Sequence, residues 1–127
     1  HEGAHSNLGA TYRNLGNTEK SLSCYDKAVK INPENVSNYY GRAVTLKEAE
    51  RIEDAEENYR KAIRLDPKHI MSYNNLALIY QERGQIKEGL DIIKKVLEFE
   101  TYIDDILLME SILSVGMKRV KLLISKL

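Results

Sequence analysis

The feature that most constrains this chain is one fixed spacing that recurs along it. The only two prolines, Pro33 and Pro67, define this spacing. Further pairs of matching type are separated by the same distance, among them Tyr25 with Tyr59, Ala28 with Ala62, and Tyr39 with Tyr73. A fixed period of this size is typical of architectures in which one small structural unit is repeated and stacked. We therefore treat the chain as an array of repeats before assigning any single element.

Apolar residues within each repeat follow helical rather than strand spacing. Leu8, Tyr12 and Leu15 are three or four residues apart, as are Leu22, Tyr25 and Val29. This spacing places them on one helical face and predicts core packing for them. Turn residues, Gly16-Asn17 and Arg83-Gly84, interrupt the pattern where a left-handed turn between two helices is expected.

This pattern resembles the tetratricopeptide repeat, a helix–turn–helix unit with the same period. The first unit matches it at Leu8, Gly9, Tyr12, Tyr25, Ala28 and Pro33. The resemblance implies an all-α solenoid of three units at residues 2–35, 36–69 and 70–103. The third unit loses the pattern in its second helix, where Gly89, Ile93 and Val96 stand. Each hairpin in such an array leaves an apolar face that a neighbour must cover.

Residues 104–127 leave the repeat pattern and predict one more helix. Thr101 and Asp104 are spaced as a capping box, which predicts the start of this helix. One apolar stripe suits a helix that seals the last repeat, and a second stripe predicts an interface through Leu108, Ile112, Val115 and Leu122. A large exposed apolar face usually marks an interaction site. Self-association through residues 104–127 is one reading, and a kink at Gly116 that folds both stripes onto the same chain is the other.

Composition excludes several classes of protein. The 19 basic and 19 acidic side chains cancel, so the chain lacks the basic footprint of a nucleic-acid-binding protein. No stretch approaches the ~20 apolar residues of a membrane span. The single cysteine, Cys24, excludes an internal disulfide and favours a reducing, cytoplasmic location. The chain begins with His1 rather than Met, as a segment of a longer protein would.

Residues 1–5 match the zinc-protease motif H-E-x-x-H, with His1, Glu2 and His5. That chemistry requires a third protein ligand and a buried helix, and the remaining histidine, His69, lies in a predicted turn. The repeat register also explains His5, as a substitute for a packing aromatic residue. A zinc hydrolase therefore remains only a remote alternative. We expect no enzyme, no metal and no cofactor, since the sequence also lacks a phosphate-binding loop and a nucleophile elbow.

The resemblance implies a concave groove, lined by the first helix of each unit, that binds a peptide or a partner helix. Carried over by register, the groove residues are Asn7, Arg13, Tyr40, Val44, Lys47, Met71, Asn74, Asn75 and Leu78. Family members that clamp a chaperone's C-terminal carboxylate use Lys, Arg and Asn at positions that hold Ser6, Ala10, Gly41, Met71 and Asn75 here. Only Asn75 suits that role, which argues against chaperone-tail binding. We predict a non-catalytic scaffold or adaptor. The alternative is a structural or oligomerising segment that acts through its last helix.

Overall fold

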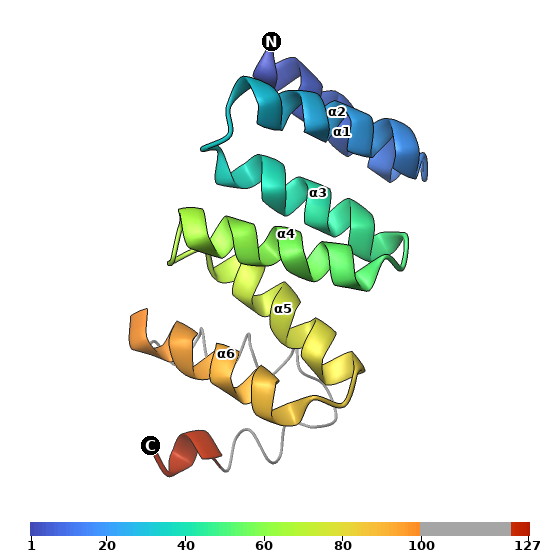
Figure 1. Ribbon diagram of the computed structural model, residues 1–127. Coiled ribbons are helices and arrows are strands. Elements are labelled where there is room, and N and C mark those ends of the chain that lie inside the picture. The colour runs from blue at the N-terminus through green and yellow to red at the C-terminus, as the bar shows by residue number, and fades with distance from the viewer. Residues whose placement is uncertain (100–122) are drawn as a thin grey trace. The chain divides into compact units, whose positions relative to one another are not determined.

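The computed structural model describes residues 1–99 and 123–127, and these residues are helical with no strand. Within residues 1–99, six helices follow one another with short connections (Figure 1): α1 (Glu2–Asn14), α2 (Thr18–Ile31), α3 (Val36–Glu48), α4 (Ile52–Leu65), α5 (Ile70–Glu82) and α6 (Ile86–Phe99). The first helices of successive pairs begin at Glu2, Val36 and Ile70, so they are one repeat length apart. The all-α fold predicted from the repeat is confirmed for the described residues.

The helices pair as antiparallel hairpins in two compact units. The first unit, His1–His69, holds the hairpins α1–α2 and α3–α4, with α2 packed against α3. The second, Ile70–Leu127, holds the hairpin α5–α6. Figure 1 shows α3 and α4 running side by side in opposite directions, with their connecting turn at one end. None of the described helices has the length and apolar character needed to cross a membrane.

Turn and cap residues fix where the helices begin and end. Gly16 and Gly84 both have positive φ, 78° and 74°, in the left-handed region that glycine adopts without steric cost. The left-handed turns predicted at these two positions are confirmed. Asn17 and Asn35 cap α2 and α3, because their side-chain oxygens accept hydrogen bonds from Lys20 N and Ser37 N. Such caps satisfy backbone donors that have no partner within the helix.

Tyr25 fills the space between the two hairpins of the first unit. Its side chain is only 4% exposed. A Cβ atom added at Gly9 of α1 would lie 2.9 Å from the Tyr25 ring, and one added at Gly41 of α3 would lie 2.6 Å from it. Both distances are too short for two carbon atoms, so the ring requires glycine on each side. The sequence-based prediction that Tyr25 fills a gap between layers is confirmed.

Buried hydroxyl groups join the same helices beside this ring. Ser21 Oγ donates to the Gly9 carbonyl at 2.7 Å and lies 3.0 Å from Thr45 Oγ1. Thr45 Oγ1 in turn donates to the Gly41 carbonyl at 3.0 Å. Buried polar groups are tolerated when they are hydrogen-bonded in this way.

Leu8 of α1 and Leu15, which follows the end of α1, do not join the core that the helical spacing predicts for them. Leu8 is 46% exposed and Leu15 is 75% exposed, so the prediction of core packing is wrong for both. The physical reason is their position in the first hairpin. In the next repeat the equivalent of Leu8 is Arg42, which contacts Asp26 of the preceding helix α2. None of the described elements of the first unit takes that place beside α1.

The second unit has its own core between α5 and α6. Tyr73 and Phe99 lie with ring centroids 5.5 Å apart, and Ile93 and Val96 of α6 are buried. Near the chain's end, Leu127 lines a hollow of about 270 Å³ together with three residues of α6, namely Lys94, Leu97 and Glu98. The rest of the predicted terminal helix, including Leu108, Ile112, Val115 and Leu122, lies outside the described residues.

Candidate protein-binding site

The predicted groove residues all lie on the first helix of a hairpin. In the first unit, α1 carries Asn7 and Arg13, and α3 carries Tyr40, Val44 and Lys47. In the second unit, α5 carries Met71, Asn74, Asn75 and Leu78. Asn7 and Met71 are exposed and the others are half-buried. Each of these residues is therefore accessible, at least in part, on its own unit.

An ion pair that includes the predicted groove residue Arg13 joins α1 to α3 in the first unit. Arg13 Nε lies 4.0 Å from Glu48 Oε2, and their side chains are 22% and 59% exposed. Arg13 Nε is itself buried and has no hydrogen-bond partner. The repeat register predicted Arg13 as a groove residue but not Glu48, because nothing in the repeat pattern distinguishes Glu48 from a solvent-facing residue.

Tyr40 belongs to a cluster of three rings. Its ring centroid lies 5.9 Å from that of Tyr59 and 5.3 Å from that of His69, the latter in an edge-on arrangement. Such geometries are favourable between aromatic rings. They pack the Tyr40 ring against Tyr59 and His69. The repeat spacing placed Tyr59 in the core, but no signal in the sequence pointed to His69.

Tyr59, whose ring packs against Tyr40, has a buried hydroxyl group. The Tyr59 side chain is fully buried, and its hydroxyl has no hydrogen-bond partner. Burial raises the pKa of Tyr59, and the nearby Tyr40 and Glu48 act in the same direction while Arg13 opposes them. For His69, burial lowers the pKa, and the Asp66 carboxylate partly offsets this effect. His69 is therefore biased towards its neutral form beside Tyr40.

In the second unit, the asparagine expected to contact a ligand backbone also makes a local bond. Asn75 Nδ2 donates to the Met71 carbonyl at 2.9 Å, one helical turn earlier. An amide group can donate and accept several hydrogen bonds, so this bond fixes the orientation of the side chain and uses one of its donors.

Two residues at the positions of the chaperone-binding clamp, Ser6 and Gly41, make contacts within the first unit instead. Ser6 Oγ donates to Asn38 Oδ1 at 2.6 Å, which links α1 to α3. Gly41 is buried, and the Tyr25 ring fills the space that a side chain there would need. These contacts add a steric reason to the sequence argument against a carboxylate clamp.

The glutamate of the H-E-x-x-H match makes contacts of a different kind. Its carboxylate accepts hydrogen bonds from Asn35 Nδ2 at 2.6 Å, Asn38 Nδ2 at 2.7 Å and Asn32 Nδ2 at 3.4 Å. The bonds from Asn35 and Asn38 lower the pKa of Glu2. Glu2 therefore links α1 to the start of α3. Within residues 1–99 and 123–127, no three His, Cys, Asp or Glu side chains are grouped closely enough to hold a metal ion.

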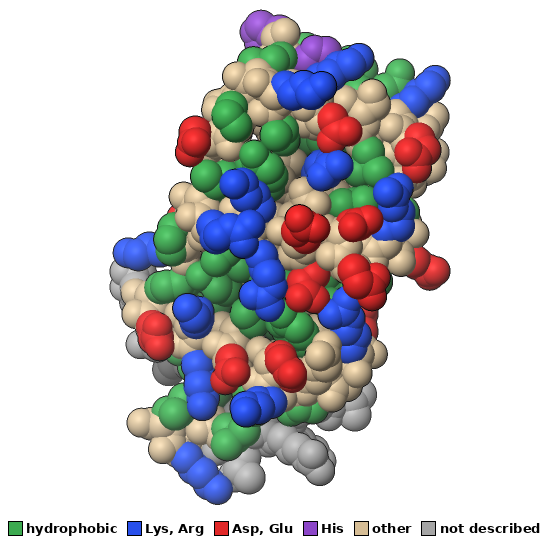
Figure 2. All heavy atoms as spheres, in the orientation of Figure 1, with side chains coloured by type: hydrophobic (Ala, Val, Ile, Leu, Met, Phe, Trp, Pro, Cys, Tyr) green, Lys and Arg blue, Asp and Glu red, His purple; other side chains and the backbone are tan. Residues whose placement is uncertain are grey.

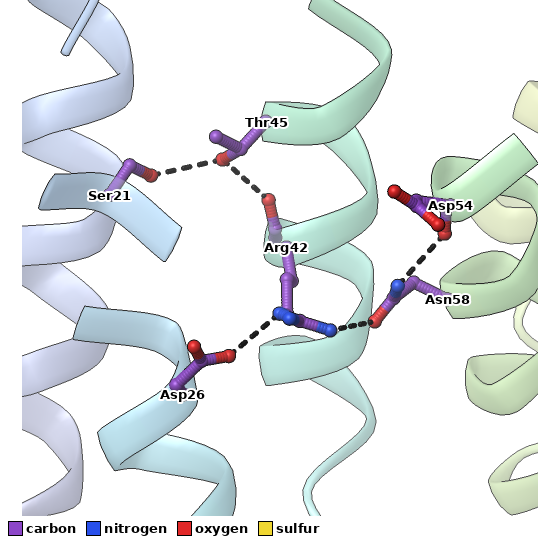
Figure 3. Close-up of polar contacts among 7 residues, drawn as sticks. Ser21, Asp26, Arg42, Thr45, Asp54 and Asn58 are labelled. Carbon is purple, nitrogen blue, oxygen red and sulfur yellow. Dashed lines mark hydrogen bonds and ion pairs between the residues drawn. The ribbon is translucent and has the colours of Figure 1, made fainter. Parts of the chain in front are cut away.

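A second polar chain crosses α2, α3 and α4 (Figure 3). Arg42 Nε lies 2.8 Å from Asp26 Oδ1, and Arg42 Nη1 donates to Asn58 Oδ1 at 3.3 Å. Asn58 Nδ2 donates to the Asp54 carbonyl at 2.9 Å. One arginine of α3 thus contacts the helix before it and the helix after it, which fixes the spacing of the two hairpins.

Sequence models of the tetratricopeptide repeat match residues 3–35, and again residues 24–57 and 58–91. The last two matches alone span more than half of the chain. The chain therefore belongs to the tetratricopeptide repeat family, a fold that generally serves protein–protein interaction without catalysis. No curated protein matches the chain by sequence.

Solved structures share the fold. A crystal structure of MamA superposes with a TM-score of 0.73 at 24% identity, covering 76% of this chain and 57% of that one. The first tetratricopeptide domain of Spaghetti (RPAP3), bound to the HSP90 peptide SRMEEVD, gives a TM-score of 0.74 at 16% identity and covers 98% of this chain and 95% of that one. The second domain of that protein gives 0.70 at 20% identity, covering 78% and 92%. The chain spans a little over half the length of the MamA chain.

Proposed function

We propose that this protein is a non-catalytic adaptor that binds an extended peptide along the first helices of its repeats. The observation that carries the proposal is that the first unit presents Tyr40, packed against Tyr59 and His69, on α3 and an arginine, Arg13, paired with Glu48, on α1. Tyrosine and arginine are both enriched at binding hot spots. The similar first domain of Spaghetti (RPAP3) is bound to an HSP90 peptide, which supports a peptide as the class of ligand.

The predicted groove residues of each unit define the chemistry of the peptide segment that we expect that unit to bind. Tyr40 and Val44 suit an apolar side chain, whereas Lys47 and Arg13 suit an acidic group. Asn7 of the first unit, and Asn74 and Asn75 of the second, offer amide groups to a peptide backbone. Met71 and Leu78 add apolar contacts on α5. Since the clamp positions differ, we expect recognition of an internal or mixed apolar and acidic segment rather than a C-terminal carboxylate.

Affinity measurements against an array of mixed apolar and acidic peptides test the proposal. We expect Tyr40→Ala to weaken the strongest binder at least about tenfold, as is usual for loss of an aromatic hot spot. Lys47→Glu reverses the charge at this position, and it should shift the preference away from acidic peptides.

Tyr39→Ala is the matched control, because Tyr39 is adjacent in sequence but on another side of α3, where its hydroxyl donates to the Pro33 carbonyl. Circular dichroism verifies that each variant is folded. Absence of peptide binding, or equal losses for the Tyr39 and Tyr40 variants, would contradict the proposal.

A further inference from the structure

Four charged residues form a stripe along the exposed side of α4. At about 100° per residue, their positions fall within a sector of about 60° on the helix surface. They lie opposite the buried residues Ala55, Tyr59 and Ala62, and all four are exposed. The charged stripe consists of Glu53, Glu57, Arg60 and Arg64.

The order of charges along this stripe is antisymmetric. Acidic side chains gather over the half of α4 that follows Ile52, and basic side chains gather over the half that ends at Leu65 (Figure 2). Glu53 lies as far before the midpoint of the stripe as Arg64 lies after it, and the same is true of Glu57 and Arg60. Interaction with the helix dipole favours acids at one end and bases at the other. It does not require that the charges stand at matching distances from the midpoint.

We propose that the charged stripe of α4 binds the same stripe of a second copy of this chain, with the two helices antiparallel about a two-fold axis. In this arrangement Glu53 faces Arg64 of the second copy, and Glu57 faces its Arg60. A two-fold interface uses the same patch on both subunits, so the patch must be self-complementary. The antisymmetric order of charges meets that condition, whereas parallel alignment would place like charges together.

Two side chains of the stripe have charge available for such a contact. Glu57 and Arg64 form no ion pair with any other described residue. Arg60 Nε lies 3.3 Å from Glu56 Oε2, but exposed pairs of this spacing contribute only about 0.3–0.5 kcal/mol. Exchange of that contact for one across the interface is therefore inexpensive.

The size of the stripe predicts a weak, salt-sensitive dimer. α4 has 14 residues and is about 21 Å long, so one helix face covers less than the roughly 800 Å² per partner of a standard interface. Most of the attraction comes from exposed charges, and salt screens such charges over about 10 Å at 0.1 M. This interface is separate from the peptide-binding face of α1 and α3, and it does not use residues 104–127.

Sedimentation equilibrium of the full chain tests the proposal. We expect dimers in about 20 mM salt and at least about tenfold weaker association in about 500 mM salt, because the attraction is screened. A chain that stays monomeric at low salt, or a dimer that is insensitive to salt, would overturn the proposal.

Charge reversal then identifies the interface. The variant Glu53→Lys/Glu57→Lys makes the stripe wholly basic, and Arg60→Glu/Arg64→Glu makes it wholly acidic. Each alone should associate at least about tenfold more weakly than the wild type, since like charges then face each other. An equimolar mixture of the two should recover association, as should the variant with all four reversals.

The matched control is Lys27→Glu/Lys30→Glu on α2, which changes net charge as much as Arg60→Glu/Arg64→Glu does. Both lysines are exposed, and we expect this variant to dimerise like the wild type. Circular dichroism confirms that every variant is helical. If the mixture fails to recover association, or if the control loses as much as the stripe variants, the interface is not the charged stripe.

Discussion

The two hairpins of the first unit follow one plan but differ at the residue that turns the chain. Gly16 connects α1 to α2 with φ 78°, and Glu50, at the equivalent position of the next repeat, connects α3 to α4 with φ 62°. Left-handed backbone costs a residue with a Cβ atom roughly 1–2 kcal/mol. The second hairpin adopts the turn in spite of this cost. Helix packing within the repeat therefore imposes the turn geometry, and glycine only makes it easier to form.

The hairpins differ again at the position that faces the preceding repeat. Asn7 of α1 is exposed, whereas its equivalent in α3, Gly41, is buried against the Tyr25 ring. The first hairpin has no described neighbour on this side, and the second has α2. The same place in the repeat therefore accepts a polar side chain in one hairpin and excludes every side chain in the other.

Gly41→Ala is the strongest test of this difference. The added methyl group would lie 2.6 Å from a ring that has little room to move away, because Gly9 lies close to its other edge. Overpacking of this kind costs about 1–3 kcal/mol, which exceeds the gain of up to about 1 kcal/mol from the higher helix propensity of alanine. We expect urea denaturation to show a free energy of unfolding lower by about 1–2 kcal/mol.

Gly89→Ala is the matched control for that substitution. Gly89 is also a buried helical glycine, but a Cβ atom there would lie 3.7 Å from Tyr80 Cβ, an ordinary contact. This variant should be as stable as the wild type or more stable, since only the higher helix propensity of alanine affects its free energy of unfolding. Equal effects at the two glycines would show that Tyr25 does not restrict Gly41.

Exchange of the turn residues sharpens the comparison of the two turns. Glu50→Gly should raise the free energy of unfolding by about 0.5–1 kcal/mol, because relief of the left-handed strain exceeds the entropy that glycine adds to the unfolded chain. Gly16→Ala should lower it by about 1 kcal/mol for the converse reason. Thermal denaturation of both variants measures the two effects. If they had the same sign, the turns would not be equivalent.

The smallest expected change in the free energy of unfolding concerns the contact that Glu2 makes between the two hairpins. Hydrogen bonds from Asn35 and Asn38 lower the pKa of this carboxyl group below its ordinary value. A depressed pKa in the folded state stabilises the protein above the unfolded-state pKa, and the contribution is lost as the pH falls through the folded-state pKa. The wild type should therefore exceed Glu2→Gln in stability at neutral pH, and the difference should shrink on acidification.

Denaturation of both proteins at about pH 7 and about pH 3 measures this difference, because protonation of the other carboxylates affects the two equally. Glu34→Gln is the control, since the Glu34 side chain is exposed and makes no hydrogen bond or ion pair with another described residue. A difference between wild type and Glu2→Gln that does not change with pH would contradict the role of the asparagines.

The sequence was sufficient to predict the helix pairs, the left-handed turns at Gly16 and Gly84, and the burial of Tyr25. These features repeat, so each one is supported by its equivalents in the neighbouring repeats. Leu8 and Leu15 were assigned to the core in error, because helical spacing identifies a face and does not show whether a neighbour covers it. Glu48 and His69 were missed, since their contacts join residues far apart in the sequence and leave no periodic trace.

The empty position at Gly41 also bears on which substitutions this protein can accept over evolutionary time. The Tyr25 ring occupies the space that a side chain at position 41 would need. A side chain there would require a smaller residue at position 25. A single substitution at position 41 would meet the ring first. The two positions must therefore change together, which makes this pair of residues resistant to drift.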